Sequence, residues 1–379
     1  MSYPKVVVAY ANGNLLSDVA AVDGIAGLVG TVNTAGLQGS PVVVFNLADA
    51  ESKGFTEAAE PAMHRHLKEF YGEVGGNQEL YVMGVAATQT MADILDETNV
   101  AGAKKLITAA EGKVRLLGVF RKPPTGYAAG TDFLDADVSA AVVKAKVFAQ
   151  ARLAALTPLR ILIEGRIAVE SSATIYEPDT ASNGFAGVVL GGTLPDNSAS
   201  VGLALGRAVK YPAHIKLGKV ANGPLSITNA YVGSKLIKDL VSLESIHGKG
   251  YISFMKHPQK AGVYFGIDRM SSNDDYRLLA HGRVLDKAAV IAAATYVEQV
   301  ESEVNVTADG NISDSDIAYL SALIDQQIKV NMGDQISGLE VTISPAQNII
   351  NTNTLSVKLR VRPVGYTSFI EIELGLTAA

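Results

Sequence analysis

The final part of the chain, residues 338–379, contains three short runs in which apolar and polar side chains alternate. They span residues 339–343, 355–362 and 369–374. Such alternation is typical of a β-strand with one buried face, and it places Ile370, Ile372 and Leu374 on one side of the last run. A strand needs partners for its backbone N–H and C=O groups. The last run therefore requires a sheet edge, which belongs either to this chain or to a neighbouring molecule.

The middle of the chain has a different pattern, in which helices and strands alternate. Continuous apolar runs at 80–85, 114–120, 159–164 and 187–191 indicate buried strands, and intervening segments such as 137–156 indicate helices. This order predicts a largely parallel sheet with helices on both faces. We therefore expect an open, doubly wound α/β domain. Because hydrophobic residues make up 48% of the chain and aromatic residues only 6%, its core must consist mainly of Ala, Val, Ile and Leu.

The second half predicts a smaller mixed domain that ends in the three terminal runs. Ser313 is followed by Asp316, which resembles a helix-capping box with Asp in place of Glu or Gln. The other expected elements are strands at 251–255 and 262–265, a long helix over 274–300, and a second helix whose buried stripe holds Ile317, Leu320, Ile324 and Ile328.

Charge and composition exclude several classes of protein. The net charge of −6 argues against a nucleic-acid surface, which requires clustered Lys and Arg. The absence of Cys excludes disulfides and Cys-ligated metals. The longest apolar run, around 288–297, is too short to span a membrane, and no charged-then-apolar leader opens the chain. We expect a soluble cytoplasmic protein.

The sequence offers no catalytic, cofactor or metal site. The glycines of 24–30 lack the spacing of a phosphate-binding loop. His64 and His66 lie two positions apart on a predicted helix, so they point to different faces and cannot share a metal. Asp274 and Asp275 are more typical of a helix start than of a catalytic pair. We therefore predict that the protein is not an enzyme and uses no cofactor.

Several segments resemble one known family. Residues 250–257 (GYISFMKH), 262–265 (GVYF) and 283–288 (RVLDKA) resemble the C-terminal domain of contractile tail sheath proteins. The turn at 362–365 (RPVG), followed by 369–374, resembles the closing strand of that family. Sheath proteins form the contracting outer tube of phage tails and related injection systems.

The resemblance implies an architecture of four parts. These are an N-terminal arm (1–20), an outer, sandwich-like α/β part (21–245), a tube-proximal α+β domain (246–362) and a C-terminal arm (363–379). In this family the two arms add strands to the sheets of neighbouring subunits, and a contact of this kind that does not close builds a helical tube.

The resemblance also implies which residues make these contacts. Lys358 and Arg360 would then face Glu371 and Glu373 across paired strands. The arm residues are Val6 and Val8 at the N-terminus with Ile370, Ile372 and Leu374 at the C-terminus, and the receiving strands carry Val341, Ile343, Val357 and Leu359.

The implied partners are further copies of the chain, in stacked hexameric rings, together with an inner tube protein and baseplate and terminator proteins. Neither nucleic acid nor membrane insertion is expected, and assembly takes place in the cytoplasm to give a tail or injection particle. By family analogy a helix of the C-terminal domain contacts the tube. Residues 313–330 are our candidate, with Asp325 and Lys329 as exposed charges, although a merely solvated helix face explains the same pattern.

Two alternatives remain open at this point. A cytoplasmic α/β enzyme that binds a nucleotide or small metabolite explains the middle of the chain, but it explains neither the terminal strands nor the missing site. A closed-ring baseplate or tube protein would form discs in place of long tubes. The sequence does not distinguish a phage tail from a cellular injection system.

Overall fold

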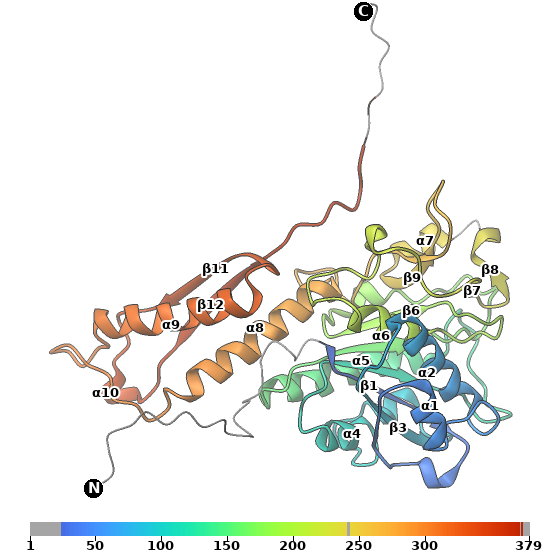
Figure 1. The fold of residues 1–379 in the computed structure, drawn as a ribbon, viewed down its shortest axis with the longest axis horizontal. Coiled ribbons are helices and arrows are strands. Elements are labelled where there is room, and N and C mark those ends of the chain that lie inside the picture. Colours follow the sequence, from blue (N-terminus) through green and yellow to red (C-terminus); the bar gives the residue numbers. More distant parts are fainter. Residues whose placement is uncertain (1–23, 241–242, 372, 374–379) are drawn as a thin grey trace, which may run out of the picture.

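The computed structural model describes residues 24–240, 243–371 and 373. These residues form a rounded α/β unit and an elongated C-terminal lobe that projects from one side of it (Figure 1). The predicted arm contacts of Val6, Val8, Ile372 and Leu374 concern residues outside the described ones.

The α/β unit is built on one eight-stranded sheet with the order β10-β9-β6-β5-β4-β1-β3-β2. All pairs from β9 to β3 are parallel, whereas the edge strands β2 and β10 are antiparallel to their neighbours. The strands are β1 (Ala26–Val32), β2 (Val42–Val44), β3 (Leu80–Ala86), β4 (Leu116–Phe120), β5 (Arg160–Glu164), β6 (Ala186–Leu190), β9 (Tyr251–Met255) and β10 (Tyr264–Phe265), and a separate hairpin joins β7 (Tyr231–Val232) to β8 (Lys235–Leu236).

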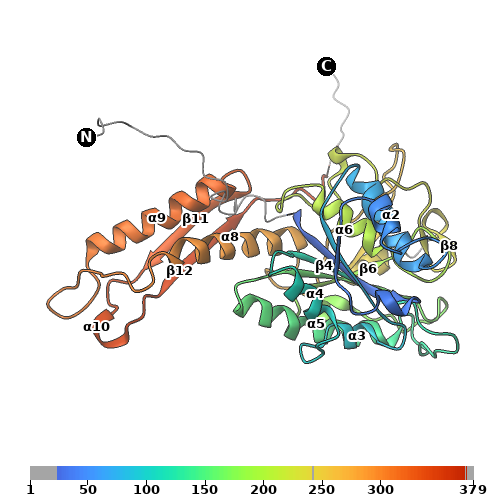
Figure 2. The ribbon, with the colours of Figure 1, turned by 60° about the horizontal axis from the view of Figure 1, so that its bottom comes forward.

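Helices cover both faces of this sheet, which confirms the doubly wound α/β prediction. Figure 2 shows α2 and α6 on one face, and α3, α4 and α5 on the other. Every residue of β1, β4, β5 and β6 is buried, as expected for continuous apolar strands between two helical layers. The helices are α1 (Leu47–Ser52), α2 (Pro61–Val74), α3 (Met91–Ile94), α4 (Ala103–Ala109), α5 (Ala136–Ala154), α6 (Val201–Val209) and α7 (Leu243–Gly248).

The C-terminal lobe contains two long helices under a two-stranded sheet. Its elements are α8 (Leu279–Val297), α9 (Asp314–Met332), β11 (Ile336–Ile343), α10 (Ile349–Thr352) and β12 (Val357–Pro363). The hydroxyl of Ser313 accepts a hydrogen bond from Asp316 N at 3.2 Å, so the predicted cap does begin α9. The helix expected over 274–300 is shorter at both ends.

The large sheet extends further along the chain than the sequence suggests. β9 and β10 are its last two strands at one edge, so the division expected at 245/246 cuts through this sheet. The lobe begins only with α8. Sequence periodicity predicts that a segment is a strand but does not identify its partner, which accounts for the difference.

Candidate assembly interface

The sheet of the lobe consists of one antiparallel strand pair. Leu339 lies opposite Val361, and Val341 lies opposite Leu359. Among residues 24–240, 243–371 and 373, no further strand pairs with the outer edge of either β11 or β12. Each strand therefore presents one row of backbone N–H and C=O groups to a possible added strand.

The face of this sheet toward α8 and α9 is apolar but incompletely covered. Ile328 and Met332 of α9 and Ile291 of α8 are buried beneath it. Of the six alternating apolar strand residues, only Ile343 is buried, and the others are half-buried: Leu339, Val341, Val357, Leu359 and Val361. Strands added at the edges would extend this layer and cover more of the apolar surface.

The opposite face is polar and rich in cations. Lys358, Arg360 and Arg362 alternate along β12 and are exposed. Arg360 Nη1 lies 3.2 Å from Glu340 Oε1 on β11, and both side chains are about 60% exposed. Within the single chain, Arg360 thus pairs with Glu340 and not with Glu371 or Glu373. An exposed pair of this kind contributes at most about 1 kcal/mol.

Tyr366 fastens the chain to the α/β unit just after β12. Its hydroxyl donates a hydrogen bond of 2.6 Å to the carbonyl oxygen of His214. Its ring stacks on His281 of α8, with centroids 5.4 Å apart, and lies 5.2 Å from Lys216 Nζ. Burial raises the pKa of Tyr366 to about 12. These contacts fix the position from which the C-terminal segment departs.

Beyond Tyr366 the chain leaves the body of the protein. Phe369 is 83% exposed and Ile370 is 76% exposed. Residues 369–371 and 373 belong to no strand in the single chain, although their sequence alternates. A cleft of about 610 Å³ lies at the root of this segment, between residues 363–369 and Lys216, Arg277 and His281. Exposed aliphatic and aromatic side chains on a departing segment are unfavourable unless a partner covers them.

A buried ion pair joins α8 to the large sheet. Arg160, the first residue of β5, donates two hydrogen bonds of 2.7 Å to the carboxylate of Asp286. Its guanidinium also donates to the carbonyl oxygens of Gly184 and Gly282. The carboxylate and guanidinium are both at least 95% buried. Because the guanidinium donates one hydrogen bond to each oxygen of the carboxylate, the pair links the lobe firmly to the sheet.

Asp268 lies where α8 begins. Its Oδ2 accepts a hydrogen bond from Ala280 N at 3.2 Å, and its Oδ1 lies 3.8 Å from Lys216 Nζ. Burial raises the pKa of this carboxyl to about 6, although Lys216 opposes the shift. The same lysine contacts the ring of Tyr366, so this carboxylate and the root of the C-terminal segment share one neighbour.

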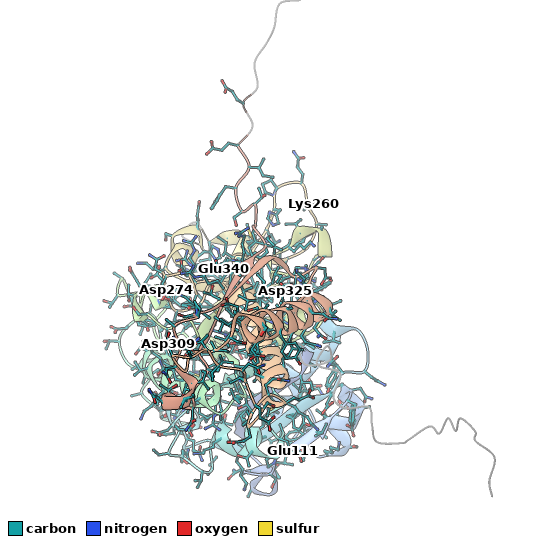
Figure 3. All side chains as sticks on the ribbon, turned by 90° about the vertical axis from the view of Figure 1, so that its left-hand side faces the viewer. Glu111, Lys260, Asp274, Asp309, Asp325 and Glu340 are labelled. Carbon is teal, nitrogen blue, oxygen red and sulfur yellow. The ribbon has the colours of Figure 1, made fainter. Side chains whose placement is uncertain are left out.

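The predicted tube-contact residues lie on α9. Lys329 Nζ is 2.6 Å from Asp325 Oδ2, and the lysine is the more exposed of the two. Figure 3 views the lobe end on, with Asp325 on α9 and Glu340 on β11. Tyr319 and Val330 are also exposed on this helix.

The polar groups at the carboxyl edge of the large sheet hold loops together. Glu60 accepts hydrogen bonds from Asn33 N and Thr34 N, and Glu164 accepts them from Arg121 N and Ala199 N.

The described part of the chain holds no group of three or more His, Cys, Asp or Glu residues arranged for a metal. Its helices are each too short or too polar to cross a membrane.

Sequence reasoning did not identify Tyr366, Arg160 or Asp268. An aromatic residue directly after the turn at 363–365 was the available signal for Tyr366. Asp286 interrupts the apolar positions of its helix, which was a signal that a buried cation had to face it. The cation itself is 126 positions away, and no local pattern connects the two.

The fold of both parts is similar to that of chains in solved structures of contractile particles. One similar chain comes from the structure of the 6-fold symmetrised baseplate of the anti-feeding prophage (TM-score 0.62, 15% identity, 100% of each chain covered). Another comes from the contracted helical sheath of the same particle (TM-score 0.63, 14% identity, 99% of each chain). A sheath tail protein from Listeria innocua is similar over 92% of this chain and 95% of its own (TM-score 0.53, 12% identity).

The chain belongs to the DUF2586 family. The N-terminal domain of that family matches residues 3–269, and its C-terminal domain matches residues 275–379. This division falls between the last strand of the large sheet and the first helix of the lobe. No curated protein sequence matched the chain.

Proposed function

We propose that this protein is the sheath subunit of a contractile tail or injection particle. It polymerises into a helical tube around an inner tube protein and shortens to drive that tube through a target envelope. The observation that carries this proposal is the lobe's strand pair, whose outer edges pair with no further strand of the described residues, together with an alternating terminal run whose Phe369 and Ile370 are exposed. The full-length similarity in fold to sheath proteins supports it.

Neighbouring copies are connected by donated strands. Ile370, Ile372 and Leu374 of one copy extend the apolar layer of the next copy, beside Val357 and Leu359. Val6 and Val8 join the other edge, beside Val341 and Ile343. Because such a contact is not self-complementary, it continues from copy to copy and does not close in a pair.

Charge favours the β12 edge for the C-terminal segment. Glu371 and Glu373 would lie on the polar face, where Lys358 and Arg362 have no ion-pair partner within the described chain. The β11 edge presents Glu340 on that face and would repel the two glutamates. Arg360 is shared between Glu340 and the added strand.

The root at Tyr366 sets the direction in which the segment leaves, and residues 367–369 form the hinge between subunits. In this mechanism an extended array is metastable and contracts by rotating its rigid units about these connections. The work comes from the difference in free energy between the subunit contacts of the extended array and those of the contracted array. No nucleotide is therefore consumed, and the subunit needs no catalytic site.

The tube protein contacts α9. Asp325 and Lys329 supply charges there, and exposed Tyr319 and Val330 supply apolar contact. Baseplate and terminator proteins bind the two ends of the array. The subunit assembles in the cytoplasm without nucleic acid or membrane insertion.

Negative-stain electron microscopy of the purified chain tests this function. A version truncated after Ser368 retains Tyr366 and its contacts but lacks the alternating segment. Tubes from the full chain and none from the truncation are the expected result. A Glu371→Asp variant is the matched control, because it changes the same segment while preserving its apolar face and its charge, and it should form tubes.

Other outcomes separate the alternatives. Tubes from both chains would refute strand donation by residues 369–374. Closed discs from the full chain would indicate a baseplate or tube protein. A chain that stays monodisperse at all concentrations and binds a metabolite would contradict the sheath function and favour the enzyme.

A further inference from the structure

The cleft at the root of the C-terminal segment, which we call the root cleft, is built to hold a ligand. Its volume of about 610 Å³ lies within the range of about 300–1,000 Å³ that is usual for ligand pockets, and it far exceeds the space that a single ion or water needs. Its walls combine basic side chains, those of Lys216, Arg269 and Arg277, with apolar ones, those of Leu278, Val364 and Phe369. This lining fits a ligand that is both acidic and partly apolar.

The basic side chains of the root cleft are only partly neutralised within the chain. Arg269 Nη2 lies 3.2 Å from Asp179 Oδ2, and Lys216 Nζ lies 3.8 Å from Asp268 Oδ1. Arg277, by contrast, is exposed and forms no ion pair with any described residue. One guanidinium of the cleft is therefore left without a counter-charge.

Two buried nitrogen atoms of the lining also lack partners. Nε of Arg269 and Nε2 of His281 are both buried, and neither has a hydrogen-bond partner among the described residues. A buried polar group without a partner costs free energy, so its occurrence in a native structure requires an explanation. A carboxylate in the cleft would pair with Arg277 and also accept hydrogen bonds from the lining.

The far end of the lobe carries a segment with the complementary chemistry. This tip segment, residues 297–303 (VEQVESE), begins at the last residue of α8. Val297 is 65% exposed and Val300 is 67% exposed. Three further residues of the segment are acidic, exposed and without an ion-pair partner among the described residues: Glu298, Glu301 and Glu303. The tip segment thus presents unpaired carboxylates beside apolar side chains that nothing in the described chain covers.

Helix α8 holds the root cleft and the tip segment apart. Leu278, its N-cap, and His281, in its first turn, line the cleft, whereas Val297 ends the helix. Nineteen residues give α8 a length of about 28 Å, and Figure 1 shows it extending outward from the α/β unit. The hydroxyl of Tyr296 donates a hydrogen bond of 3.2 Å to the carbonyl oxygen of Leu320, which fastens the outer end of α8 to α9. The two surfaces therefore do not meet within one chain.

We propose that the root cleft receives the tip segment of a second copy of the chain. The inference rests on the proposed function, in which identical subunits surround each other, and it adds a second contact between them. The glutamates pair with Arg277 and the unpartnered nitrogen atoms, and the valines pack against Leu278 and Phe369. Because the two surfaces differ and lie at opposite ends of α8, the contact is heterologous and continues from copy to copy. Since residues 363–369 form one wall of the cleft, the bound tip also fixes the direction in which the donated strand leaves.

Disulfide trapping tests this contact, because the chain has no cysteine of its own. A Ser302→Cys variant and a Thr367→Cys variant are mixed, assembled and oxidised. Both positions are exposed, and Thr367 lines the root cleft. Each chain carries one cysteine, so a 302–367 disulfide joins two copies. The matched control replaces Ser302→Cys with Ala346→Cys, which is also exposed on the lobe, in the loop between β11 and α10.

We expect the 302–367 disulfide in tubes at a yield several-fold above that of the 346–367 control. Equal yields, or tubes without the 302–367 disulfide, would refute the contact and leave the proposed function intact. A 302–367 disulfide in protein that forms no tubes would refute the sheath function and keep the contact.

Citrate is the probe for a dissolved anion in the root cleft. The melting temperature of the parent should not depend on citrate any more than that of an Arg277→Glu variant does. A rise with citrate in the parent alone, without the 302–367 disulfide in tubes, would assign the cleft to a small carboxylate and overturn the contact between copies.

A charge exchange provides a second readout. Arg277→Glu and Glu301→Arg should each leave the melting temperature of the monomer unchanged, because both side chains are exposed. Each should raise the concentration needed for tube formation by about tenfold or more, since like charges then meet. The double variant should assemble more readily than either single variant, because the exchanged pair attracts again. Additive losses in the double variant would contradict the pairing of the tip segment with the root cleft.

Discussion

The strands of the large sheet and those of the lobe are built from the same aliphatic residues, but the chain covers them to different extents. β4 and β5 are buried along their whole length. β11 and β12 have one partly covered face, no further strand of the described residues pairs with their outer edges, and their apolar residues are mostly half-buried. The described chain supplies eight strands to the large sheet, whereas we propose that other molecules complete the sheet of the lobe. We therefore expect substitutions in the large sheet to reduce the stability of the monomer and substitutions in the sheet of the lobe to reduce assembly.

The largest expected loss of stability follows from breaking the ion pair that connects the two regions. Arg160→Met leaves the carboxylate of Asp286 buried without its partner, so we expect a loss of about 3–5 kcal/mol in the free energy of unfolding. Chemical denaturation followed by circular dichroism measures this loss. Adding Asp286→Leu should recover much of it, since the uncompensated charge is then removed. Equal losses from the single and double variants would show that the pair is not what joins lobe and sheet.

A matched pair of core substitutions compares the two sheets directly. Ile163→Ala in β5 removes a fully buried side chain and should cost about 2–5 kcal/mol. Leu359→Ala in β12 should cost about 1 kcal/mol in the isolated chain, because its side chain is only half-buried there. The assembled tubes should lose far more stability with Leu359→Ala than the monomer does. If the two variants destabilised the monomer equally, the proposed contrast between the sheets would be wrong.

Asp268 makes the junction sensitive to pH. Its carboxyl has a pKa of about 6 in the folded protein against 3.8 normally, so the folded state holds this proton more tightly than the unfolded chain. The stability contributed by Asp268 should therefore fall as the pH rises from about 4 to about 6, by on the order of 2–3 kcal/mol. Asp268→Asn should remove this part of the pH dependence. Parallel pH profiles for parent and variant melting temperatures would contradict the effect.

Reversing the charge of the cations of β12 should have the smallest effect on the stability of the monomer. Lys358→Glu with Arg362→Glu should change monomer stability by no more than about 0.5 kcal/mol, since both side chains are exposed. Tube formation should nevertheless fail, because the variant edge repels Glu371 and Glu373. Charge reversal at those two glutamates, in the same chain, should restore tubes. Failure of this rescue would place the donated strand at the β11 edge.

The sequence predicts local structure well where one pattern extends over a whole element. The structure contains the strands predicted from the apolar runs of β3, β4, β5 and β6. It also contains the helix cap at Ser313 and the strands predicted from the alternation in β11 and β12. The contacts that join distant segments were not predictable, because they depend on three-dimensional proximity. β9 joins β6, Arg160 meets Asp286, and Tyr366 meets His214, each across a long stretch of chain.

Hydrogen–deuterium exchange of the monomer and of assembled tubes tests strand donation most directly. In the monomer, backbone amides of residues 369–374 should exchange as fast as those of an unstructured peptide. In tubes they should be protected to the same degree as β12, together with the outer amides of β12 itself. Protection of these residues already in the monomer, or rapid exchange in both states, would contradict the claim that this segment completes the sheet of a neighbouring subunit.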